Sequence, residues 1–200
     1  MADDSAMIAD LPHVAEERLA LADLDARLLG ADMPFVVRGL AAHWPMVVAA
    51  QQSNEAVRAY LLAHQRHRDF PANIGIADGE SRLFYDASMA MNFRQIQSPL
   101  APLFTAIAEA EGQPDARVIY LSSIDLHDYF HGLAEANSLP FGTRRPLESI
   151  WIGTRTIIAT HNDVPNNLAV CVAGRRLFTL FPPNQFSNLY LGPLENTPAG

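Results

Sequence analysis

The sequence predicts an α+β fold in which a sheet or barrel follows a helix-rich N-terminal part. Two observations predict it. Apolar residues recur at helical spacing through much of the first two-thirds of the 200 residues. Strand-forming residues and a hairpin signal gather in the last third, most densely between residues 149 and 191. We expect a flexible leader over residues 1–12 and a single domain over residues 13–200.

Four segments have the pattern of helices: residues 14–29, 46–64, 92–111 and 126–136. Gly30 ends the first of them. Ser53 and Asn54 are a break or a cap within the second, and Ser98 with Pro99 divides the third into two parts.

Short segments rich in β-branched and aromatic residues predict strands over residues 34–40, 70–76, 82–85 and 117–123. Asp78 and Gly79 form a turn between two of them, and residues 138–146 are a connection. In the last third, residues 172–176 predict a hairpin turn between the strands NLAVCV and LFTLF. A closed barrel needs roughly eight strands and the last third supplies about four, so we expect an incomplete barrel.

The composition excludes several function classes. The net charge is −8 and there is no Lys, so the chain lacks the basic surface that nucleic acid requires. The single Cys171 excludes an internal disulfide and suits a reducing compartment. The acidic N-terminus does not resemble a signal peptide, and no apolar run is long enough to span a bilayer. We therefore expect a cytoplasmic protein that does not contact the membrane.

The tripeptide His161-Asn162-Asp163 is the first candidate metal site. On an extended segment, side chains two residues apart point to the same side. A His and an Asp so placed supply two of the three ligands of a two-His-one-carboxylate iron site. The alternative is that Asp163 caps a turn and that a hydroxyl such as Thr160 satisfies His161. A second H-x-D pattern, His67-Arg68-Asp69, follows a helix in a charged stretch and predicts solvated surface.

A second candidate is the pair His127 and His131, which would share one face of a helix as in metal-dependent hydrolases. No third ligand follows at the usual spacing, so the sequence favours two surface histidines on an amphipathic helix over a metal site.

Three further residues are candidates for a pocket beside His161. The strand after it would place small side chains on the inward face, which leaves room for a co-substrate. Arg176 opens the next strand and either binds an anion or lies at the solvated tip of the hairpin. Tyr120 either donates its hydroxyl into the pocket or is a buried core tyrosine.

Together these residues resemble a known family. The run H-N-D-x-x-x-N-x-x-x-x-x-x-G-R-R-x-F-T-L-F-P-P-x-Q-x-x-x-L-Y is similar to the cupin-like JmjC family, including the asparaginyl hydroxylase that inhibits hypoxia-inducible factor and many bacterial relatives. PFVVRGL…HWP and RVIYLSS resemble earlier parts of the same domain. The resemblance implies a double-stranded β-helix, or jelly roll, with a helix-rich part over residues 13–147 and the first half of the jelly roll over residues 148–200.

The resemblance also implies roles for individual residues. Family members bind Fe(II) and 2-oxoglutarate, and His161 and Asp163 match two of their iron ligands. Asn167 matches a polar residue that lines the co-substrate pocket. Arg176, where the family commonly has Lys, and Tyr120 match the groups that bind the distal carboxylate of 2-oxoglutarate.

This sequence departs from the family pattern in two further places. Ile158 stands where the asparaginyl hydroxylase has a Thr that binds the co-substrate, and Thr156 or Thr160 would have to replace it. The third ligand of the family is a His on a later strand, and no His follows Asp163 in these 200 residues.

The sequence therefore supports two functions. The first is an Fe(II)- and 2-oxoglutarate-dependent oxygenase that hydroxylates a protein or peptide side chain. The alternative is a non-catalytic cupin-like binding module without a complete metal site. In either case an incomplete barrel exposes strand edges, which predicts a homodimer through those edges or an unstable chain.

Overall fold

The computed structural model describes residues 11–75, 81–163 and 165–192. The predicted leader and the turn at Asp78 and Gly79 therefore lie largely or wholly outside the described residues. In the first half of the described chain the elements are β1 (Ala15–Glu17), η1 (Leu21–Asp23), α2 (Leu24–Leu29), β2 (Phe35–Val37), α3 (Pro45–Gln52), α4 (Asn54–His64), β3 (Phe70–Gly75) and β4 (Arg82–Leu83). The second half contains β5 (Phe93–Ser98), α5 (Leu100–Ala110), β6 (Ile119–Asp125), α6 (Leu126–Tyr129), α7 (Leu133–Ala136), β7 (Ser149–Gly153), β8 (Ile157–Ile158) and η2 (Pro183–Asn188).

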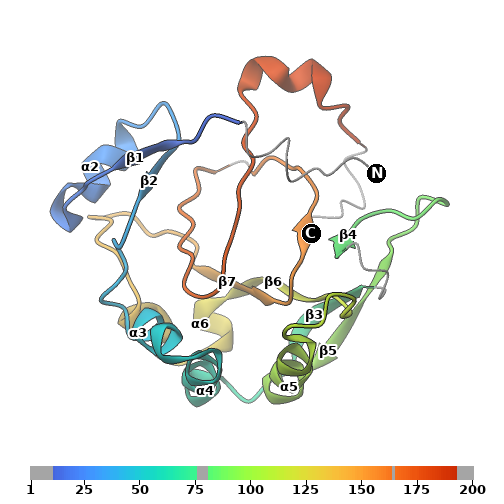
Figure 1. Ribbon diagram of the computed structural model, residues 1–200. Coiled ribbons are helices and arrows are strands. Elements are labelled where there is room, and N and C mark those ends of the chain that lie inside the picture. The colour runs from blue at the N-terminus through green and yellow to red at the C-terminus, as the bar shows by residue number, and fades with distance from the viewer. Residues whose placement is uncertain (1–10, 76–80, 164, 193–200) are drawn as a thin grey trace.

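The centre of the fold is a four-stranded antiparallel sheet with the order β5-β3-β6-β7. Two small parallel pairs, β1 with β2 and β4 with β8, lie apart from it. Figure 1 shows α3, α4 and α5 together on one side of the central sheet and the chain from β8 to η2 on the other side. The described sheets do not close into a barrel.

The main core lies between the central sheet and the helices. Helix α5 buries Leu100, Leu103, Phe104 and Ile107, the i, i+3, i+4, i+7 pattern of a helix with one apolar face. These side chains belong to one buried cluster with residues from β3 and β6, among them Phe70 and Leu121. The opposite face of the sheet carries a smaller cluster: Leu83, Val118 and Tyr120, with Phe93 and Ile158 packed against it. The sheet therefore separates two environments, and Tyr120 faces the side away from the main core.

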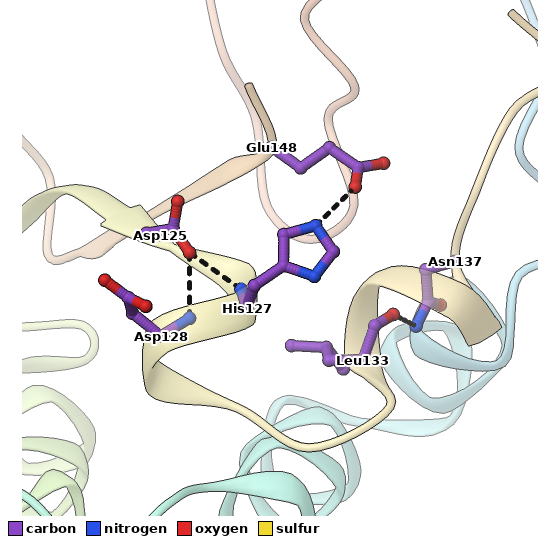
Figure 2. Close-up of polar contacts among 6 residues, drawn as sticks. All are labelled: Asp125, His127, Asp128, Leu133, Asn137 and Glu148. Carbon is purple, nitrogen blue, oxygen red and sulfur yellow. Dashed lines mark hydrogen bonds and ion pairs between the residues drawn. The ribbon is translucent and has the colours of Figure 1, made fainter. Parts of the chain in front are cut away.

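Asn137 connects the helices around the core. Its buried side chain accepts a hydrogen bond from the backbone N–H of Met46, 3.0 Å away, at the beginning of α3. It also donates to the carbonyl of Leu133 at 2.8 Å, as Figure 2 shows, and to the hydroxyl of Tyr60 at 3.2 Å. One side chain thus satisfies an N–H that α3 itself leaves without a partner and joins α3 to α4 and α7.

The predicted break at Ser53 is confirmed. Its Oγ accepts a hydrogen bond from the backbone N–H of Ala56 at 2.9 Å, so Ser53 ends α3 and caps α4. The predicted strands over residues 34–40, 70–76, 82–85 and 117–123 are also present with shifted ends, as β2, β3, β4 and β6.

Two helix predictions are wrong in part. Within residues 14–29, β1 pairs in parallel with β2 and only the second half is helical. Within residues 92–111, β5 pairs along its whole length with β3, and the helix begins only at Leu100 after Pro99. In both cases the segment pairs with a neighbouring strand, and this pairing satisfies its backbone N–H and C=O groups in place of the hydrogen bonds of a helix.

The short helix predicted over residues 126–136 is divided. Helix α6 ends at Tyr129, and Gly132, with a φ of 63°, turns the chain before α7 begins. A non-glycine residue rarely adopts that backbone conformation.

The predicted hairpin of the last third is also corrected. Gly174 does form a turn, with a φ of 74°, but the flanking segments NLAVCV and LFTLF are not paired strands in the described structure. Exposed apolar side chains such as Leu177, Phe178 and Leu180 lie along the second of these segments. A strand needs a neighbour for its N–H and C=O groups, and the described residues supply none here. The described helices include none that is long and apolar enough to cross a membrane.

Candidate functional site

His161 and Asp163 follow β8 on the side of the sheet away from the main core. The ring nitrogen Nδ1 of His161 lies 2.7 Å from the carbonyl oxygen of Ala159. A carbonyl oxygen only accepts hydrogen bonds, so Nδ1 is the donor in this contact and Nε2 is the ring nitrogen left to face Asp163. That Nε2 lies 3.8 Å from Oδ1 of Asp163. Both side chains are about half exposed, at 43% and 53%.

Asn167 fixes the other oxygen of this carboxylate. Its side-chain amide donates to Oδ2 of Asp163 at 2.7 Å. The position of Asn167 matches the resemblance, but in the structure its amide is committed to Asp163. Each member of the His161–Asp163 pair is therefore held by one bond on its outer side while Nε2 and Oδ1 face each other.

Tyr120 and Arg176 are the two other residues that the sequence predicted for the site. Tyr120 is buried on β6, directly opposite Gly153 on β7. Burial raises the pKa of the Tyr120 hydroxyl, and the positive charge of Arg176 lies near enough to oppose part of that rise. The phenol therefore keeps its proton at neutral pH and is available as a hydrogen-bond donor. Arg176 is exposed, with its Cζ 6.0 Å from the centre of the Phe178 ring.

A family model described as a cupin-like domain matches residues 22–200, nearly the whole chain. The chain belongs to this cupin-like domain family. No curated protein and no solved structure matches it. The mixed helix and sheet content of the fold is that of the cupin-like domain, although the described sheets remain open.

The donor atoms of His161 and Asp163 stand slightly too far apart to share a metal ion without adjustment. Two neighbouring ligand atoms each about 2.1 Å from one ion lie about 3.0–3.4 Å apart, so the 3.8 Å between Nε2 of His161 and Oδ1 of Asp163 would have to shorten by about half an ångström. Hydrogen bonds on the outer side of a ligating His and a ligating carboxylate are usual at metal sites, and both are present here. Among the described residues, however, no group of three or more His, Cys, Asp or Glu side chains converges on one point.

The pair His127 and His131 does not form a metal site. Helix α6 ends before His131, so the two rings do not share a helical face, which corrects the prediction of one helix over both residues. Both histidines are exposed, as the favoured interpretation of surface residues expects. Figure 2 shows Nε2 of His127 paired with Glu148, at 3.0 Å, and the Asp125 carboxylate accepting from the N–H groups of His127 and Asp128. These contacts cap α6 and join it to the start of β7. The other H-x-D pattern is exposed surface, as predicted.

Two groups of the site were not found from the sequence. The carbonyl of Ala159 orients His161, and a backbone atom leaves no signal in residue type. Gly153 allows β7 to lie close against Tyr120: a Cβ there would stand 2.5 Å from the carbonyl oxygen of Ile119 and 3.2 Å from the Tyr120 ring. A glycine within a strand is the only signal, and it indicates a close backbone approach.

Proposed function

We propose that this chain is part of an Fe(II)- and 2-oxoglutarate-dependent oxygenase of the JmjC type, acting on a protein or peptide side chain. The observation that carries the proposal is the arrangement of His161 and Asp163. The outer bonds to Ala159 and Asn167 leave Nε2 and Oδ1 facing each other at 3.8 Å. Membership of the cupin-like domain family supports it.

The residues of the proposed site would have two roles, metal binding and co-substrate binding. His161 and Asp163 would hold Fe(II), and Asn167 would keep the carboxylate of Asp163 in its orientation. Arg176 and the protonated hydroxyl of Tyr120 would bind the distal carboxylate of 2-oxoglutarate, a cation and a neutral donor to one anion. Fe(II) with 2-oxoglutarate supplies the activation of dioxygen, in which 2-oxoglutarate is oxidised to succinate and carbon dioxide.

Metal binding and turnover test this function separately. We expect Mn(II), titrated in place of Fe(II), to bind the chain, and His161→Ala to weaken that binding at least about tenfold. His13→Ala, which removes an exposed histidine outside the site, is the matched control. With Fe(II) and 2-oxoglutarate, succinate release should be lost in His161→Ala and kept in His13→Ala. Equal Mn(II) affinity and equal turnover in both variants would contradict the assignment.

A non-catalytic binding module is the second candidate, because the described residues offer two metal donors and not three. In that case Arg176 and Tyr120 bind an anion without metal. Binding of 2-oxoglutarate, measured in the presence of a metal chelator, distinguishes the non-catalytic module from the oxygenase. It should be lost with Arg176→Gln and unchanged with His161→Ala if the module is non-catalytic, whereas an oxygenase site needs the metal for tight binding.

A further inference from the structure

A cavity of about 510 Å³ lies on the helix side of the sheet, between β5 and α5, and a second cavity of about 380 Å³ adjoins it at the beginning of β5. The two cavities together are called the groove below. The lining is mainly apolar and includes Ile96 and Leu103. The two cavities share Ile74, Arg94 and Arg117, so the two arginines stand where the cavities meet. These volumes are in the range of ligand and peptide sites.

The two arginines have no acidic partner among the described residues. Other arginines of the fold do: Arg27 pairs with Glu17, and Arg58 pairs with Glu111. Both groove arginines are exposed, in a chain of net charge −8. The one carboxylate in the lining is Glu109, on the α5 wall. The groove therefore has a local excess of positive charge and favours an acidic ligand.

The groove also borders an open strand edge. In the described part of the chain β5 pairs with β3 only, so its outer N–H and C=O groups have no strand partner. Such an edge accepts an additional strand. Ile74 pairs with Arg94 on one side and with Ile119 on the other, so the residues at this end of the groove share one face of the sheet. Every second side chain of an added strand would point to that same face.

None of the residues that line the groove belongs to the site described above. Ile119 lines the larger cavity, whereas the next residue along β6, Tyr120, belongs to the cluster on the opposite face of the sheet, which Phe93 of the smaller cavity also contacts. A ligand in the groove would not touch His161 or Arg176 through that face. The inference below is therefore independent of the proposed oxygenase function.

We propose that this groove binds an extended acidic segment of a partner protein, which adds as a strand to β5. A carboxylate of the segment lies between Arg94 and Arg117, and apolar side chains beside it cover Ile96 and Leu103. A strand provides the backbone hydrogen bonds, and the two guanidinium groups select acidic residues. The unpaired edge of β5, whose residues line the groove, favours a peptide over a small carboxylate, because only a peptide adds backbone hydrogen bonds to that edge.

Fluorescence anisotropy with a short labelled peptide of alternating Glu and Val tests the charge requirement. The same peptide with Gln in place of Glu should bind at least about tenfold more weakly, since a hydrogen bond to a charged group is lost. Arg94→Gln and Arg117→Gln should each weaken binding of the Glu peptide about tenfold. Glu109→Gln should tighten it, because it removes the carboxylate that repels the ligand.

The matched control is Arg145→Gln, which removes an exposed arginine outside the groove. It should bind the Glu peptide as the unchanged chain does. Equal weakening in Arg145→Gln would show general electrostatic attraction and overturn the site. Unchanged melting temperatures should accompany every variant, since all four side chains are exposed.

Hydrogen exchange tests the mode of binding. The Glu peptide should slow exchange of backbone amides in β5, and free glutarate at equal carboxylate concentration should not displace it. Failure of the chain to bind the Glu peptide, absence of protection in β5, or displacement by glutarate would each overturn strand addition.

Discussion

Replacement of Gly153 by Ala tests whether close contact between β7 and β6 builds the site. The added Cβ would stand 2.5 Å from the Ile119 carbonyl oxygen and 3.2 Å from the Tyr120 ring. A carbon and an oxygen without a bond need more than about 3 Å, so one of the two strands has to move by roughly half an ångström. The carbonyl is fixed, because it already accepts a hydrogen bond from the N–H of Thr154 at 3.0 Å.

Such overpacking costs about 1–3 kcal/mol. For a domain of this size, about 2 kcal/mol lowers the melting temperature by about 4–8 °C. The strand shift should also displace Tyr120 relative to Arg176 and weaken binding of 2-oxoglutarate. Thermal melting followed by circular dichroism and a titration with 2-oxoglutarate measure the two effects.

Gly192→Ala is the control, since a Cβ there meets nothing within 4 Å. It should leave the melting temperature unchanged or slightly raised, because alanine restricts the unfolded chain. The reasoning is refuted if Gly153→Ala melts within about 1 °C of Gly192→Ala, a difference of less than about 0.5 kcal/mol.

Three further predictions concern stability and the anion site. Asn137→Ala should destabilise the fold by about 2–3 kcal/mol in urea denaturation, because it leaves the N–H of Met46 buried without a partner; a loss below about 1 kcal/mol would contradict this role. The hydrogen bond from Arg58 lowers the pKa of Glu111 below its ordinary 4.5, so the pair stabilises the fold above that pH and the contribution disappears as the pH falls through the lowered pKa. Glu111→Gln should therefore cost about 0.2–1 kcal/mol at neutral pH and nothing in strong acid, and a cost independent of pH would show that charge is not its source. Tyr120→Phe should weaken the binding of 2-oxoglutarate about tenfold without changing the affinity for Mn(II), since it removes a hydrogen-bond donor to the carboxylate but no metal ligand. Weaker binding of both 2-oxoglutarate and Mn(II) would instead indicate a displaced strand.

Local signals predicted much of the fold. Ser53 has the residue type and the position of a cap, and its hydrogen bond reaches only three residues along the chain. Helix α5 follows from its apolar spacing after Pro99, which needs no knowledge of the partner. The predictions failed where pairing with a distant segment decides the outcome. Residues 93–98 contain no strong strand signal, and β3 supplies the backbone partners that make them β5.

The same distinction between local signals and pairing with distant segments applies to the candidate site. The sequence by itself brings His161, Asp163 and Asn167 together, because they are near neighbours whose contacts span two to four residues. No local pattern places Arg176 near Tyr120, 56 positions earlier in the chain; the family resemblance implied it, and the tertiary structure brings the two together. It also placed the arginines of the groove together at one end of the sheet. Strand register sets both arrangements, and register depends on backbone pairing between segments that no local pattern describes.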